Sequence, residues 1–212
     1  MQKETINTMN KIEEFLYDVF NEKKAAAVAA DLIGVIEEIK PAALVDSPKE
    51  SMNRDEFIKK IKALELEVVF EIREYVNKSG EVIKHGNLFV SKKRILAEKL
   101  KEELEKMWST LNSGKIIDRA KWKKSSLEIG KMLGYPETAV EYFVEHTNDD
   151  MVEIDDDWTE RMNRNRYYAH SKEHEKEEFL AYDKPLNVAI EKYLPVTAEI
   201  LRSDKNRRWK EY

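Results

Sequence analysis

Two kinds of chemistry are open to the side chains of residues 164–174, which read RNRYYAHSKEH. Arg164 and Arg166 precede His170; an arginine can stabilise charge that develops on a phosphoryl group, and a histidine can move a proton near neutral pH. His170, Glu173 and His174 instead form a closely spaced set of donors suited to a divalent metal ion. The segment therefore predicts either a catalytic arginine–histidine pair or a metal site.

The metal interpretation rests on the spacing His170-x-x-Glu173-His174. It matches H-x-x-E-H, the inverted zinc-peptidase signature, in which two histidines bind zinc and the glutamate acts as a base. Ser171 has the residue type of a helix N-cap, which would leave His170 outside the helix that carries the other two ligands.

The catalytic interpretation rests on a different likeness. Arg164 or Arg166, followed by His170, resembles the Arg-Asn…His motif of HEPN ribonucleases, a family of small helical bundles. The resemblance implies cleavage of RNA by these residues. Five residues separate Arg164 from His170 and three separate Arg166 from it, whereas the family has four.

A broader resemblance covers about residues 124–182. The chain resembles an uncharacterised prokaryotic family with the pattern LGYPE-(Cys)-(Cys)-V-x-x-F and a later His-Ser-Pro segment. The matching positions here are residues 133–137, Val140, Phe143, His170 and Ser171.

The chain departs from that family where the pattern has its cysteines. Thr138 and Ala139 occupy those two positions, and Lys172 stands in place of the proline. A thiol-dependent activity of the family would therefore be lost here, and the resemblance implies no particular reaction.

Residues 126–143 resemble a helix-turn-helix. One amphipathic helix is expected to end at Leu133, Gly134 provides a left-handed exit, and Pro136 suits the first turn of the next helix. Val140 and Phe143 are expected to face the core. The exposed face of the second helix would carry Glu137, Glu141 and Glu145, which would repel DNA phosphates. We therefore expect a structural helix corner and keep nucleic-acid binding as an alternative.

Basic residues gather at two places that could contact nucleic acid or an acidic partner protein. The C-terminal set is more often a solvent-exposed helix end whose charge suits the helix dipole. The candidate binding residues are Lys121, Lys123, Lys124, Arg207, Arg208 and Trp209.

Helices are the main elements expected to position these residues. Apolar side chains recur at helical spacing in residues 5–22, 25–39, 91–111, 119–133 and 136–147. Further helices are expected at 53–63, 158–168, 172–182 and 185–203, the last with a kink at Pro195. Ser91 is expected to cap the helix that follows it, and Asn112, Ser113 and Gly114 to end it.

One segment departs from helical spacing. In residues 64–73 apolar and charged residues alternate, which predicts a strand, and residues 81–90 would return as its partner. Residues 40–51 contain Pro41 and Pro48 and are expected to form a linker. The predicted fold is a mostly α, bundle-like single domain over residues 1–212, with one β-hairpin at about 64–90 packed on it and an N-terminal helical hairpin at 1–40 as a subdomain.

Composition narrows the functional classes. The 212 residues carry a net charge of −5 and no cysteine, which excludes disulfides and cysteine nucleophiles. No signal peptide or membrane-length apolar run is present, so we expect a cytoplasmic protein with no membrane contact. No cofactor is specified. We expect a binding or assembly function, with a protein partner or self-association, and keep RNA cleavage and nucleic-acid binding as alternatives.

Overall fold

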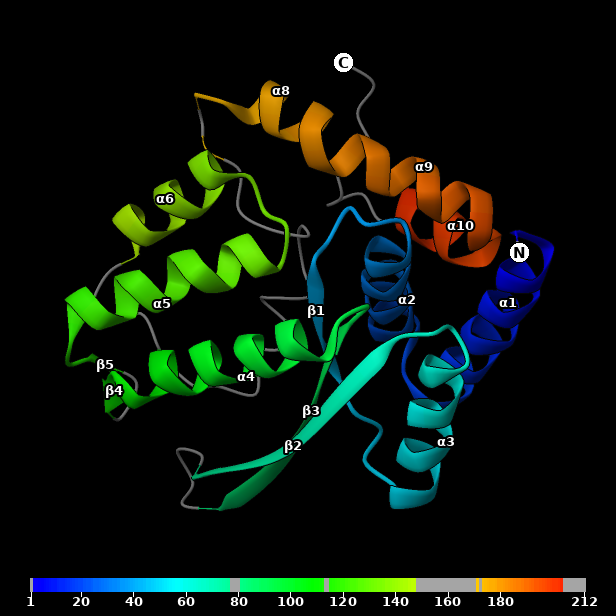
Figure 1. The fold of residues 1–212 in the computed structure, drawn as a ribbon, viewed down its shortest axis with the longest axis horizontal. Coiled ribbons are helices and arrows are strands. Elements are labelled where there is room, and N and C mark those ends of the chain that lie inside the picture. The colour runs from blue at the N-terminus through cyan, green and yellow to red at the C-terminus, as the bar shows by residue number, and fades with distance from the viewer. Residues whose placement is uncertain (1, 77–80, 113–114, 148–170, 172, 204–212) are drawn as a thin grey trace.

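The computed structural model describes residues 2–76, 81–112, 115–147, 171 and 173–203 (Figure 1). The fold is mostly helical with a small antiparallel sheet, which confirms the predicted class. No helix in these residues is both long enough and apolar enough to cross a bilayer.

Two antiparallel helices open the chain. Helix α1 spans Gln2–Val19 and helix α2 spans Glu22–Ile36. Phe20 and Asn21 separate them, and the Asn21 side chain accepts a hydrogen bond of 3.0 Å from the amide of Lys24, the usual bond of an N-cap. Four alanines of α2 are fully buried and allow its neighbours to approach closely: Ala25, Ala26, Ala29 and Ala30.

The sheet has the strand order β1-β3-β2. Strand β1 spans Ala42–Asp46, β2 spans Glu67–Val76 and β3 spans Val82–Ser91; helix α3, Ser51–Lys62, connects β1 to β2. The predicted hairpin is therefore present as β2 and β3. The predicted linker 40–51 was wrong, because the apolar run after Pro41 pairs with β3 and becomes an edge strand.

Helix α4, Arg94–Ser109, follows the sheet. Ser91 does not cap it, since Lys93 is the N-cap residue and the Ser91 hydroxyl donates 2.7 Å to the carbonyl of Pro41. Nor does Asn112 end the helix: strands β4, Leu111–Asn112, and β5, Lys115–Ile116, pair just beyond Thr110.

The predicted helix corner is formed by α5, Arg119–Met132, and α6, Glu137–His146. Gly134 has φ of +77°, the left-handed exit expected from the sequence. Val140 is buried as predicted. Phe143 was placed wrongly: it is 41% exposed and lies against Trp122, with 6.1 Å between ring centroids.

The C-terminal helices differ from the prediction in where they break. Helix α8, Glu175–Glu178, runs through a π-helical turn η1, Phe179–Asp183, into α9, Lys184–Tyr193. The break comes at Leu194, and α10, Pro195–Ser203, begins as a separate helix. The buried Glu13 carboxylate of α1 accepts bonds of 2.7 and 2.6 Å from the Thr197 amide and hydroxyl near the start of α10.

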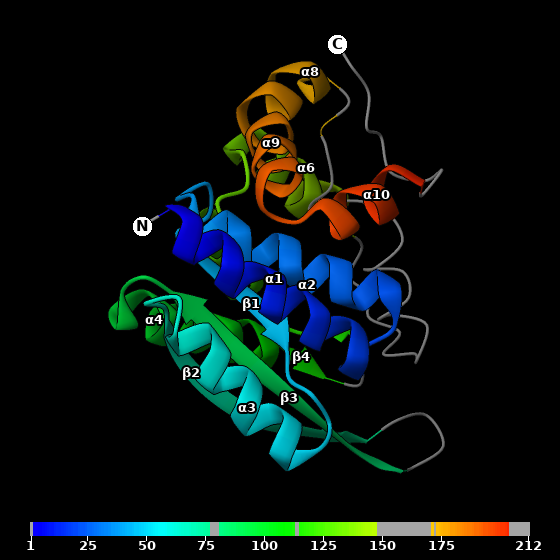
Figure 2. The same cartoon turned by 90° about the vertical axis from the view of Figure 1, so that its right-hand side faces the viewer.

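Helices cover both faces of the sheet. Side chains of Ala43, Val45, Leu88 and Val90 join a core with α1, α2, α9 and α10, whereas Ala42 and Phe89 face α4 and α5. Figure 2 shows α1 and α2 lying between the sheet and the C-terminal helices. Helix α9 is thus held on α2, with its other side open to solvent.

Candidate functional site

Most of the residues predicted to do chemistry lie outside the described residues. These are Arg164, Arg166 and His170, as well as Arg207, Arg208 and Trp209, and the predicted helix 158–168. The catalytic pair and the C-terminal binding site therefore stay predictions.

The other two proposed metal ligands lie in a turn before α8. Glu173 and His174 are both exposed. The Ser171 hydroxyl accepts a bond of 3.1 Å from the His174 amide, the bond of an N-cap, although the first α-helical residue is Glu175. Among the described side chains, no three carboxylates or histidines gather as a metal site. With His170 outside that set, the H-x-x-E-H hypothesis stays a prediction.

The buried carboxylate of Glu178 joins helix α6 of the corner to the turn that precedes α8. Glu178 is 2% exposed and accepts bonds from the hydroxyls of Thr138 and Ser171, each 2.7 Å, and from the amide of Ser171 at 2.9 Å. The network holds the turn before α8 and the last residue of α8 against the first turn of α6. Thr138, which follows the LGYPE-like segment, and Ser171 therefore meet at one carboxylate.

A buried lysine fixes the same region from the other side. Lys40 is 2% exposed and pairs with Asp31 of α2, and its ammonium lies 5.6 Å from the ring centroid of Tyr135. Burial lowers the pKa of Lys40, but the Asp31 carboxylate outweighs it and leaves the pKa above its ordinary range. The Tyr135 ring meets Tyr182 edge-on, with 5.7 Å between centroids. Helix α2, the corner and η1 are thereby held together.

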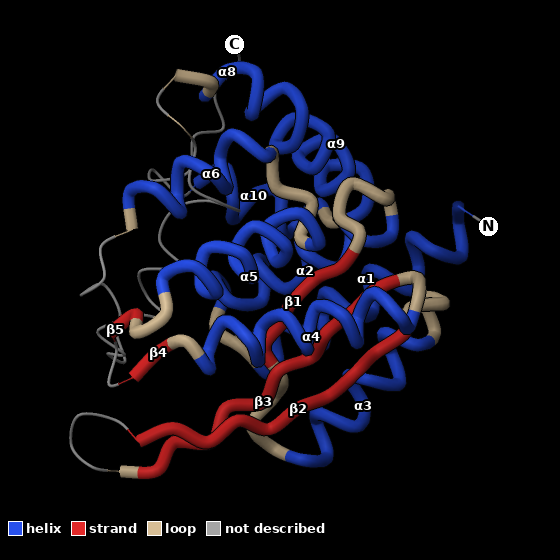
Figure 3. The backbone as a smooth tube through the Cα atoms, turned by 60° about the vertical axis from the view of Figure 1, so that its left-hand side comes forward, coloured by secondary structure: helices blue, strands red, loops and turns tan. Residues whose placement is uncertain are grey.

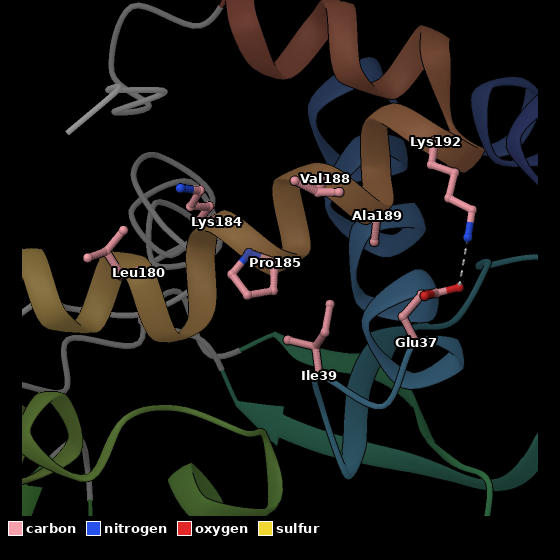
Figure 4. A pocket seen from close by; sticks show the side chains of 8 residues that line it. All are labelled: Glu37, Ile39, Leu180, Lys184, Pro185, Val188, Ala189 and Lys192. Carbon is pink, nitrogen blue, oxygen red and sulfur yellow. Dashed lines mark ion pairs between the residues drawn. The ribbon is translucent and has the colours of Figure 1, made fainter.

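The site that these contacts position is an open pocket of about 480 Å³ between α9 and the end of α2 (Figure 4). Its apolar lining comes from Ile39, Leu180, Pro185, Val188 and Ala189. Leu180 is 41% and Val188 57% exposed, so both leave apolar surface open to solvent. We call this feature the α2–α9 groove.

Charged groups stand around the α2–α9 groove. Lys184 and Lys192 are exposed residues of α9, and Glu37 follows α2. The Lys192 ammonium lies 3.9 Å from the Glu37 carboxylate and donates 2.6 Å to the Tyr193 hydroxyl. The hydroxyl contact, followed by the nearby carboxylate, raises the pKa of Lys192, so this group stays cationic.

Sequence reasoning missed the α2–α9 groove. Leu180, Lys184 and Val188 recur every four residues, but the predicted break between helices 172–182 and 185–203 separated them. The continuous run from α8 through η1 to α9 places all three on the open side, and Pro185, at the start of α9, does not interrupt it. Their four-residue spacing was the available signal.

A second polar cluster was also missed. His85 Nε2 lies 2.8 Å from Asp46 Oδ1, and Lys24 Nζ lies 2.7 Å from Asp46 Oδ2. Burial raises the pKa of Asp46, but the His85 contact and the Lys24 ammonium outweigh it and hold the pKa below its ordinary value. The cluster joins α2 to the sheet, and its histidine is partly open to solvent.

The helix corner presents opposite charges on its two helices. Lys121, Lys123 and Lys124 are exposed on α5, where Lys121 pairs with Asp118 at 3.2 Å. The second helix exposes Glu137, Glu141 and Glu145 as expected. A carboxylate row on the helix that would read DNA does not favour that function.

Comparison with protein-family models, curated proteins and solved structures gives no match for this chain.

Proposed function

We propose that this chain is a binding protein and that the α2–α9 groove holds an acidic amphipathic helix from a partner protein. The observation that supports this proposal is one side of the groove on which exposed apolar residues alternate with ammonium groups every four residues: Leu180, Lys184, Val188 and Lys192. A helix that lays its apolar face into such a groove is a recurrent mode of peptide recognition.

The spacing of the two lysines defines the partner. Lys184 and Lys192 are eight residues apart on α9, so their Cα atoms lie roughly 12 Å apart along the helix at about 1.5 Å per residue. A partner helix with two carboxylates eight residues apart would match them while its apolar residues cover Val188. Glu37 would repel a carboxylate near Lys192, so the contact with Lys184 should contribute more.

The network beneath the groove supports binding by holding α9 in place before the partner arrives. Leu186 and Ile190, on the opposite side of α9, are fully buried, and Glu178 anchors α8. A groove that is already ordered loses little conformational entropy on binding. The groove offers a partner few polar contacts, so a partner helix would bind weakly if α9 also had to become ordered on binding.

The test uses a fluorescent helical peptide of about 16 residues, with two glutamates eight positions apart and leucines between them. Fluorescence anisotropy with the full chain should give saturable binding. Val188→Asp should weaken it at least about tenfold by placing a charge in the apolar contact. Val196→Asp is the matched control, since Val196 is 50% exposed on α10 and does not line the groove.

A peptide in which lysines replace both glutamates should bind at least about tenfold more weakly, and added salt should reduce the difference. Equal binding of the acidic and basic peptides would exclude recognition by the lysines. Equal binding to the parent and to Val188→Asp would exclude the groove as the site.

A further inference from the structure

Strand β2 has an outer edge that lies against no other described strand. Within the described residues, β2 pairs with β3 alone, and β1 accompanies β3 only as far as the pair Asp46 and Asn87. Residues 72–76 and 82–86 therefore form a two-stranded ribbon. Figure 3 shows this part of the hairpin extending beyond the helices.

The direction of the backbone groups on this edge follows from one hydrogen bond. The Ser47 amide donates 2.8 Å to the carbonyl of Gly86, so the backbone N–H and C=O groups of Gly86, and of every second residue of β3, point toward β1. The backbone groups of His85 and Asn87 then point toward β2, where these residues lie opposite Arg73 and Glu71. Because the backbone groups of successive residues alternate in direction, those of Ile72 point away from β3.

Phe70 and Glu74 lie two residues to either side and share this outward direction. Within the described part of the chain, the edge thus offers three alternate residues whose backbone donors and acceptors pair with no strand, centred on Ile72. The Ile72 side chain is 51% exposed. An exposed edge with an apolar residue at its centre is a template for another strand.

The charged residues beside Ile72 favour pairing with a second β2 strand in one register. Glu71 and Arg73 lie on the same face of β2, and their side chains form an ion pair of 3.3 Å. In an antiparallel pair of β2 strands with Ile72 opposite Ile72, Glu71 of each copy faces Arg73 of the other. A pair centred on Glu71 or on Arg73 would place like charges opposite each other.

We propose that two copies of this chain pair through β2 about a twofold axis at Ile72, forming one continuous six-stranded sheet. The outward backbone groups of Ile72 then pair reciprocally, and those of Phe70 pair with Glu74 of the second copy. A twofold axis closes the assembly at a dimer and removes the open edge.

The first experiment measures the mass of the full chain by sedimentation equilibrium over a concentration series. The parent should be a dimer. Arg73→Glu has glutamate at both charged positions, and Glu71→Arg has arginine at both. Each variant should raise the dimer dissociation constant at least about tenfold, because like charges then face each other across the dimer. Circular dichroism checks that each variant is folded.

The decisive sample is a mixture of the two variants. Within each chain of the mixture, positions 71 and 73 still carry like charges. Between the two chains, however, each glutamate faces an arginine at both positions. A mixed dimer of near-parental affinity therefore reports contact between two β2 strands. Val82→Asp, at a 60% exposed residue of the neighbouring strand, is the matched control and should leave the dimer unchanged.

A monomeric parent at about 100 μM would overturn the proposal, because a specific dimer should form well below that concentration. Variants that remain dimers alone, or that fail to form the mixed dimer, would overturn it too. None of these outcomes bears on peptide binding by the α2–α9 groove, so the two proposals stand or fall separately.

Discussion

Thr138, in the first turn of α6, donates a hydrogen bond of 2.7 Å to Glu178 at the end of α8. The two residues are 40 positions apart in the chain. Because Glu178 also binds Ser171, this carboxylate holds the helix corner and the C-terminal helices in one arrangement. The position of the α2–α9 groove depends on that arrangement.

Replacing Glu178 by glutamine should destabilise the protein by about 1–3 kcal/mol. The carboxylate accepts from Thr138 and twice from Ser171, whereas an amide would turn a donor toward one of these donors. Thr138→Val removes one bond only and should cost about 1 kcal/mol. Urea unfolding measures both free energies, and a smaller loss for Glu178→Gln than for Thr138→Val would contradict the network.

Replacing Lys40 by methionine should destabilise the protein by about 2–4 kcal/mol, because Asp31 would lose its buried cationic partner. The loss should lie toward the lower end, since the Asp31 side chain is 23% exposed and keeps some hydration. Adding Asp31→Leu should recover part of the stability. A double-mutant cycle from denaturant unfolding checks this coupling, and simple additivity of the two changes would show that the pair does not interact.

Replacing Gly134 by alanine should destabilise the helix corner by about 2 kcal/mol or more. The backbone has φ of +77°, and a Cβ atom there would lie 2.6 Å from the carbonyl oxygen of Ile39. That oxygen belongs to the backbone, so a change of rotamer does not relieve the contact. The melting temperature measures the effect, and a variant as stable as the parent would mean that the corner tolerates a side chain.

The Asp46 cluster should make stability depend on pH in the acid range. Since the folded pKa of Asp46 lies below its ordinary value, its contribution is complete above about pH 4, near the unfolded pKa, and is lost as the pH falls through the folded pKa. Asp46→Asn should therefore have a smaller free energy of unfolding than the parent at pH 7, and the difference between the two should narrow toward pH 3.

Asp55→Asn is the control for that experiment, since the Asp55 side chain is 76% exposed and its ion pair with Arg54 is long, at 3.6 Å. It should change stability little at either pH. If the difference in stability between the parent and Asp46→Asn stays constant between pH 7 and pH 3, the charge of the Asp46 carboxylate is not its cause.

Local patterns in the sequence predicted most of the elements. Alternating residues around Phe70 indicated a strand, and β2 contains that position. Leu133 followed by Gly134 indicated a left-handed helix end, which the backbone confirms. These features depend on neighbours a few residues away, so the information lies within each segment.

Local patterns misled where a distant segment competed. Pro41 and Pro48 made residues 40–51 look like a linker, but hydrogen bonds to β3 make residues 42–46 a strand. Ser91 has the residue type of a helix cap, yet it lies in β3 and its hydroxyl donates to the carbonyl of Pro41. In both places a partner about 40 to 50 residues away decided the structure.

By itself, the sequence determined a mostly helical chain with one hairpin, a glycine-ended helix corner and an acidic face on the second helix. Tertiary structure alone decided that Glu178 meets Thr138, that Asp46 meets His85, and that Leu180 and Val188 line one groove. Helical and strand periodicity is set by residues within a turn or a pleat of each other. Contacts between distant residues form only when the packed core closes the loops between them, and no local pattern records which loops will close.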